Sequence, residues 1–190
     1  MNSGHVAFVT GGASRVGCSI CRSFASRGYH VLIHCNKSLE NANKLKEELR
    51  AEHPSIQADV VQCDLLDDAS VESMIGEIGN HPLVASSCGL KVIVLNASIY
   101  ELSVLNSSEG TDDAEVHIQR ENDIKLFSNM HKVHVESSYR IVTGLLPHLK
   151  RAAATTEDTE NKDGDACVVA ITDTSQGRSW HGLAAYTCAK

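Results

Sequence analysis

A tyrosine and a lysine late in the sequence are spaced for proton transfer. Tyr186 and Lys190 are four residues apart, so on a helix they lie one turn apart on the same face. An ammonium group beside a phenol favours the phenolate and lowers the pKa of the phenol toward working pH. We therefore expect Tyr186 to donate a proton, with Lys190 assisting it.

A glycine-rich segment near the start of the sequence could bind a phosphate group. Thr10–Gly17 (TGGASRVG) follows an apolar run and precedes a stretch with helical spacing. Small residues let the backbone approach a pyrophosphate, and the free N–H groups and dipole of the next helix attract its charge. The spacing G-x-G-x-x-G is absent, so an ordinary glycine-rich turn stays open as the alternative.

The residues after the second apolar run indicate which dinucleotide would fit. An acidic residue about 20 positions past the turn would bind the ribose diol of NAD, but His34–Ser38 (HCNKS) is followed by no carboxylate before Glu40. Lys37 and Ser38 could supply a cation and a donor to a 2′-phosphate, and Arg15 could reach the same region. We therefore expect NADP(H) as the cofactor, with a solvated loop lysine as the alternative for Lys37.

Strands and helices alternate along the chain. We expect strands at 5–10, 29–35, 56–63, 91–96 and 166–172, and helices at 15–27, 39–52, 67–78 and 123–149. This alternation predicts a Rossmann-like, doubly wound parallel sheet in a three-layer α/β/α fold.

Polar residues follow the third and fourth strands of this expected sheet. Asp64 closes the third strand, and Asn96–Ser98 follow the fourth. Both places lie at the carboxyl edge of the sheet, where ligands bind in such folds. An Asn or Asp at a strand end is also a common turn former, so that alternative stays open.

Composition limits the class of protein. The 190 residues (20.5 kDa, 42% hydrophobic) suit one domain over 1–190, with surface loops at 106–115 and 152–165. A net charge of −7 argues against nucleic-acid binding. With no apolar run of about 20 residues, no secretory signal and seven scattered cysteines, we expect a cytoplasmic, non-membrane protein with reduced thiols. The Cys18/Cys21 pair has no second pair to match it, so we expect no metal site.

Three motifs taken together resemble a known family. The order Thr-Gly-x-x-x-x-x-Gly, Asn-Ala-Ser and Tyr-x-x-x-Lys resembles the short-chain dehydrogenase/reductase family across the whole chain. Within that family the sequence is similar to the pteridine reductases and dihydromonapterin reductases. Arg15 replaces the middle glycine of the turn, and Lys37 stands where an arginine is common. Asp173, which is 13 residues before Tyr186, stands where most members have a serine.

The resemblance implies roles for individual residues. Gly11, Arg15, Val16 and Gly17 would hold the pyrophosphate, Lys37 and Ser38 the 2′-phosphate, and Asp64 the adenine. Asn36 would also bind the cofactor. Asn96, Ala97 and Ser98 would lie along the cofactor, and Lys190 would bind the nicotinamide ribose. Asp173 would orient Tyr186, and Arg15, Ser98 and Tyr100 would face the pterin together with Asp173 and Tyr186. His134, or Asn129 after a shift, would take the place of the family's structural asparagine.

The resemblance also implies an activity and an assembly. The expected reaction is the NADPH-dependent reduction of dihydrobiopterin, dihydromonapterin or dihydrofolate. A carbonyl reductase using Ser175 or Thr174, and a catalytically silent NADP-binding protein, are the alternatives. Members of the family usually form tetramers. We expect the chain to be a fragment of a longer reductase, ending after the fifth strand and the start of the following helix, and to have little activity alone.

Overall fold

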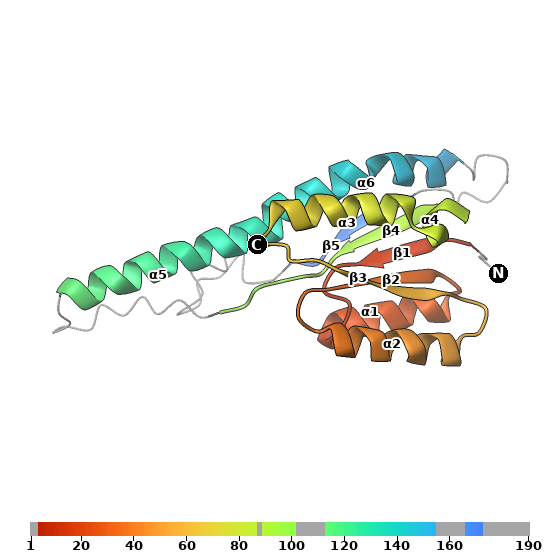
Figure 1. Ribbon diagram of the computed structural model, residues 1–190, viewed down its shortest axis with the longest axis horizontal. Helices are drawn as coiled ribbons and strands as arrows, with labels where there is room; N and C mark the ends of the chain where they lie inside the picture. The colour runs from red at the N-terminus through yellow and green to blue at the C-terminus, as the bar shows by residue number, and fades with distance from the viewer. Residues whose placement is uncertain (1–3, 87–88, 102–112, 155–165, 173–190) are drawn as a thin grey trace.

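A five-stranded parallel sheet forms the centre of the computed structural model, which describes residues 4–86, 89–101, 113–154 and 166–172. The strands are β1 (Val6–Val9), β2 (His30–Cys35), β3 (Ala58–Gln62), β4 (Leu90–Leu95) and β5 (Cys167–Ala170). Their order across the sheet is β3-β2-β1-β4-β5, and every neighbouring pair is parallel (Figure 1). The predicted Rossmann-like α/β fold is confirmed, and every strand end lies within two residues of its expected position.

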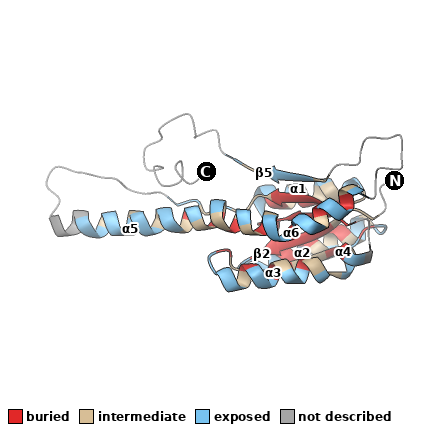
Figure 2. Cartoon of the chain, turned by 90° about the horizontal axis from the view of Figure 1, so that it is seen from above, coloured by how far each residue is buried: buried red, intermediate tan, exposed pale blue. Residues whose placement is uncertain are grey.

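Helices cover both faces of this sheet. On one face lie α1 (Arg15–Ser26) and α2 (Leu39–Glu52); on the other lie α3 (Asp68–Asn80), α4 (Pro82–Ser86) and α6 (Ser137–Ala154) (Figure 1). Alternate residues of β1 face opposite layers, because successive side chains of a strand point to opposite sides. Phe8 packs with the α3 and α6 layer, whereas Ala7 and Val9 pack with the α1 and α2 layer. Burial on both faces explains the continuous apolar runs of the central strands, which are red in Figure 2.

Strand β5 differs from the central strands. It pairs with β4 alone among the described strands, and all four of its residues are exposed. Val168 and Val169 are each 40% exposed. The sheet is therefore well covered over β1, β2 and β4 and open to solvent at β5.

The long helical region is longer than the sequence predicted. Helix α5 (Asp113–His131) continues through a π-helical turn, η1 (Lys132–Glu136), into α6. Helix therefore replaces the expected loops at 113–115 and 152–154. The early start of α5 was missed because this helix extends past the sheet (Figure 1) and most of its described side chains, at 117–131, are not buried, so they produce no clear helical periodicity. Ile118, for example, is 63% exposed. The five-residue helix α4 was also missed.

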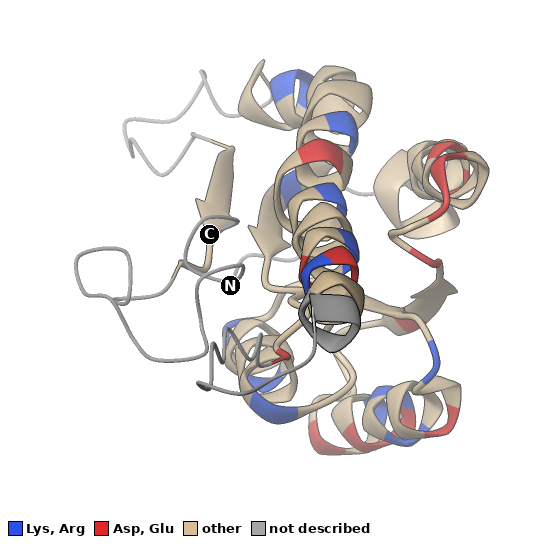
Figure 3. Ribbon diagram, turned by 90° about the vertical axis from the view of Figure 1, so that its left-hand side faces the viewer, with Lys and Arg blue, Asp and Glu red and all other residues tan. Residues whose placement is uncertain are grey.

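Ion pairs fasten the η1 and α6 region to α3. Lys132 pairs with Asp68 and, at 2.8 Å, with Glu136, while Arg140 pairs with Glu72 at 3.2 Å. The hydrogen bond from Lys132 lowers the pKa of Asp68. These groups lie at the surface. Figure 3 shows basic and acidic residues mixed along some of the helices. Surface pairs contribute little stability, so the buried apolar side chains that α3 and α6 share in one core cluster contribute more to holding these helices together.

Candidate functional site

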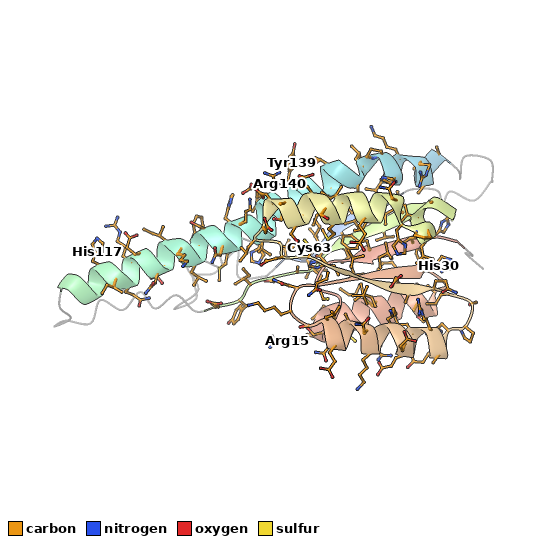
Figure 4. All side chains as sticks on the ribbon, in the orientation of Figure 1. Arg15, His30, Cys63, His117, Tyr139 and Arg140 are labelled. Carbon is orange, nitrogen blue, oxygen red and sulfur yellow. The ribbon has the colours of Figure 1, made fainter. Side chains whose placement is uncertain are left out.

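A cavity of about 510 Å³ opens at the carboxyl ends of the strands. Segments that follow all five strands contribute to its wall. Ten of the expected site residues line it: Gly11, Arg15, Val16, Gly17, Asn36, Asp64, Asn96, Ala97, Ser98 and Tyr100. Figure 4 shows Arg15 and Cys63 at this end of the sheet and His30 at the other. The structure thus brings together residues that the sequence separates by almost 90 positions.

The turn after β1 has a shape that favours glycine at two positions. Gly11 has φ +62°, a left-handed conformation that side chains rarely adopt. A Cβ on Gly17 would lie 2.1 Å from the carbonyl oxygen of Gly11 and 2.7 Å from Nδ2 of Asn96. The helix α1 therefore begins in direct contact with the turn, because position 17 has no side chain.

Arg15 is in the left-handed region as well, with φ +49°. The described residues include no other non-glycine residue with a positive φ. Such a conformation costs about 1–2 kcal/mol for a residue with a Cβ. The resemblance identified Arg15 as a replacement for the turn's middle glycine, and its backbone conformation is one that glycine adopts without strain. Its exposed side chain belongs to the cavity wall.

The start of α1 supplies donors for an anion. Ser14, Arg15, Val16 and Gly17 all line the cavity. The first N–H groups of a helix have no partner within the helix, and the helix dipole adds partial positive charge there. This end of the cavity can therefore bind a phosphate group through backbone donors.

Asn96 and Thr10 hold the turn against β4. Nδ2 of Asn96 donates to the carbonyl oxygens of Thr10 (3.0 Å) and Gly11 (3.2 Å). The Thr10 hydroxyl oxygen accepts from the backbone N–H groups of Asn96 (2.9 Å) and Ala97 (3.0 Å). The sequence assigned no such role to Thr10. Its sequence signals are its place at the start of the Thr-Gly-x-x-x-x-x-Gly motif and a hydroxyl residue at the end of a buried strand.

Residues at the carboxyl ends of β2 and β3 also line the cavity. Asn36, Lys37 and Ser38 are exposed between β2 and α2. Ser38 precedes α2 as its N-cap residue, but its hydroxyl does not cap the helix. Asp64 acts as a turn former, the alternative given for it above, because its Oδ1 accepts from the backbone N–H of Leu66 at 3.0 Å. Lys37 and Ser38 stand beside the cavity rather than in its wall.

His134 lies in the π-helical turn and reaches the segment after β4. Its Nε2 accepts from the backbone N–H of Ile99 at 3.1 Å and is 3.0 Å from the hydroxyl oxygen of Ser98. Asn129, the alternative at this position, lines a different hollow beside α5. His134 is thus the residue that fixes Ser98 and Ile99 at the cavity wall.

A second histidine, His34, was not singled out by the sequence. It is 2% exposed, and burial lowers its pKa to about 4 from an ordinary 6.5. Its Nδ1 accepts from the backbone N–H of Gly11 at 3.0 Å, and its Nε2 is 3.1 Å from the carbonyl oxygen of Cys63. The ring is therefore neutral at pH 7 and joins the turns that follow β1 and β3.

The expected proton-transfer residues Asp173, Tyr186 and Lys190 lie outside the described residues, as do Thr174 and Ser175. Their roles stay predictions.

Comparison with known proteins decides the family. The family model described as "short chain dehydrogenase" matches residues 5–190. The chain belongs to the short-chain dehydrogenase family. Its cavity at the carboxyl edge is thus a site in a short-chain dehydrogenase fold. Within the described ranges, no helix combines the length and the apolar character that a bilayer crossing requires.

Sequence relatives match only part of their own length. The chain is 30% identical over 106 residues to the chloroplastic short-chain dehydrogenase TIC 32 A of Brassica napus, covering 56% of this chain and 31% of that protein. It is 28% identical over 145 residues to the uncharacterized oxidoreductase YmfI of Bacillus subtilis (strain 168), covering 76% of this chain and 50% of that one. The chain thus spans a third to a half of these two relatives.

Solved structures share this fold. FolM alternative dihydrofolate reductase 1 from Brucella canis, complexed with NADP, is 25% identical with a TM-score of 0.68, covering 100% of this chain and 63% of its own. An alcohol dehydrogenase from Thermococcus sibiricus, complexed with 5-hydroxy-NADP, is 20% identical with a TM-score of 0.71, covering 97% of this chain and 65% of its own. At 20% identity, the similarity to the alcohol dehydrogenase supports a shared fold and nothing more.

Proposed function

We propose that this short-chain dehydrogenase binds NADP(H) in the strand-end cavity and is an oxidoreductase. The observation that carries the proposal is the turn itself, in which Gly17 meets the Gly11 carbonyl so closely that no side chain fits. This close approach exposes the first turn of α1 to a pyrophosphate. The solved relative from Brucella canis was crystallised with NADP, which supports the same cofactor here.

The preference for the phosphorylated cofactor rests on the loop after β2. Asn36, Lys37 and Ser38 are exposed there, and no carboxylate precedes Glu40. Lys37 would pair with the 2′-phosphate, and the Ser38 hydroxyl, which does not cap α2, would donate to it. An acidic residue in this loop would instead repel that phosphate and bind the diol of NAD.

The proposed substrate is a dihydropterin. Arg15, Ser98 and Tyr100 line the cavity together, so an aromatic ring, a hydroxyl and a guanidinium are available to a flat, polar heterocycle. The relative from Brucella canis is an alternative dihydrofolate reductase, and dihydrofolate contains such a ring. Asp173 in place of a serine supports the same substrate class, because a carboxyl beside a phenol suits protonation of a ring nitrogen.

The cofactor, when bound, would supply the hydride. Tyr186 would donate the proton to the substrate, and the ammonium of Lys190 would stabilise the resulting phenolate. Asp173 would orient the Tyr186 hydroxyl and help deliver the proton. His134 would hold Ser98 at the cavity wall through the contact with its hydroxyl, so that the substrate ring has one defined neighbour on that side.

The test has a binding part and a turnover part. Titration of the 190-residue chain with NADPH and NADH should give binding of NADPH that is at least about tenfold tighter. Oxidation of NADPH is then followed with dihydrobiopterin, dihydrofolate and simple ketones, using wild type, Tyr186→Phe, Asp173→Ala and Ser175→Ala. Equal affinity for NADH, or no binding of either nucleotide, would contradict the proposed cofactor.

The variants separate the possible activities. A pteridine reductase should lose most of its turnover in Asp173→Ala and retain it in Ser175→Ala. A carbonyl reductase should show the opposite pattern and should accept ketones. Tight NADPH binding without turnover of any substrate, measured in a chain extended to full length, would indicate a silent NADP-binding protein.

A further inference from the structure

One buried side chain links the two turns that form opposite walls of the cavity. His34 is in β2 and lies edge-on to Phe8, with ring centroids 6.4 Å apart. The Gly11 N–H donates to its Nδ1, and its Nε2 faces the Cys63 carbonyl oxygen. A backbone N–H can only donate and a carbonyl can only accept, so Nδ1 must be bare and Nε2 must carry the hydrogen. The contacts therefore allow one neutral tautomer.

The same residue also binds the turn through its main chain. The N–H of Gly12 donates to the carbonyl oxygen of His34 at 2.9 Å. Two successive N–H groups of the turn, those of Gly11 and Gly12, are thus directed to His34. A phosphate in the cavity must then be bound by the N–H groups that follow, at the first turn of α1.

We propose that His34 is a positioning residue, whose Nδ1 holds the Gly11 turn in the conformation that accepts the cofactor pyrophosphate. The inference rests on the proposed NADP(H) binding. Gly11 has φ +62° and a glycine has few conformational restraints of its own, so the turn depends on outside partners. Asn96 holds its carbonyl oxygens and His34 holds its N–H groups. Without an acceptor at Nδ1, the Gly11 N–H would turn to find another partner.

Two amide variants, each able to replace one ring nitrogen, separate this role from general packing. In His34→Asn, the side-chain oxygen can occupy the place of Nδ1 and accept from Gly11, but nothing reaches the Cys63 carbonyl. In His34→Gln, the side-chain nitrogen can occupy the place of Nε2 and donate to Cys63, but Gly11 loses its acceptor. Each variant loses one buried hydrogen bond, so both should show similar losses of thermal stability.

The affinity for NADPH should differ between the two. We expect the dissociation constant of His34→Asn to stay within about threefold of wild type, and that of His34→Gln to rise at least tenfold. Equal weakening in both variants, or in neither, would overturn the inference while leaving the proposed function intact. Failure of the wild-type chain to bind NADPH would overturn both.

A measurement on the wild-type chain covers the case in which neither variant folds. Nitrogen-15 NMR of labelled histidines reports which ring nitrogen carries the hydrogen. At pH 7 the inference requires His34 to be neutral with its hydrogen on Nε2. A hydrogen on Nδ1, or a protonated ring, would overturn the inference because Gly11 would then have no acceptor.

Discussion

Replacing Gly17 with alanine should disable the nucleotide site while leaving the sheet folded. A Cβ at this position would lie 2.1 Å from the Gly11 carbonyl oxygen, 2.7 Å from Nδ2 of Asn96 and 2.9 Å from the Gly11 carbonyl carbon. Two of these three atoms are backbone, so no side-chain rotation relieves the contact. The turn and α1 would have to separate by roughly 1 Å, and overpacking of this kind costs about 1–3 kcal/mol.

This separation would act directly on the site. It would stretch the Asn96 bonds to the carbonyls of Thr10 and Gly11, which are 3.0 and 3.2 Å long, and would move the first turn of α1. We expect the dissociation constant for NADPH to rise at least about tenfold, equivalent to 1.4 kcal/mol. Fluorescence titration measures the affinity, and urea unfolding measures the stability.

Gly76 provides the matched control. It is exposed in α3, and a Cβ there meets nothing within 4 Å. Gly76→Ala should therefore raise the free energy of unfolding by about 0.5–1 kcal/mol and leave NADPH affinity unchanged. If Gly17→Ala bound NADPH as tightly as Gly76→Ala does, the close approach of turn and helix would not be what shapes the site.

Three further predictions concern individual side chains. Because burial lowers the pKa of His34 from 6.5 to about 4, protonation favours the unfolded chain; stability should be intact above pH 6.5 and fall by about 3 kcal/mol as the pH drops to 4. Urea unfolding across this range should show a smaller loss of unfolding free energy for His34→Asn than for wild type. If the unfolding free energies of both proteins fell equally with pH, the lowered pKa of His34 would be contradicted. His134→Ala leaves the Ile99 N–H without its acceptor, so the free energy of unfolding should fall by about 1–2 kcal/mol, with His134→Asn losing less; equal stability of all three proteins would argue against the contact. Lys37→Ala should raise the NADPH dissociation constant about tenfold and leave that for NADH unchanged, whereas parallel changes for both nucleotides would rule out a 2′-phosphate partner.

The sequence predicts the elements that produce a clear local pattern. The central strands are continuous apolar runs because both faces of the sheet are buried. The alternation of these strands with helices predicts that the strands are parallel. Because the carboxyl ends of parallel strands share one edge, the positions of Asp64 and Asn96 at strand ends were enough to place both near the glycine turn. His134 could be predicted only through the family resemblance, since nothing in its local sequence indicates the contact with Ser98.

The remaining features depend on partners far away in the sequence. Thr10 braces Asn96 from 86 residues away, and His34 accepts from Gly11 across 23 residues. No local pattern indicates such pairs. The side chains of Asn96 and Asp64, both expected to contact the cofactor, also form hydrogen bonds to the backbone of turns. The sequence does not predict the first ten residues of α5, because a helical segment with little buried surface has no apolar stripe.

A crystal structure of the chain with NADP⁺ is the most direct test of the central claim. We expect the pyrophosphate against the first turn of α1, beside Gly11 and Gly17, and the 2′-phosphate within hydrogen-bond distance of Lys37 or Ser38. Nucleotide bound away from this turn, or a 2′-phosphate pointing into solvent with Lys37 and Ser38 unengaged, would contradict the claim.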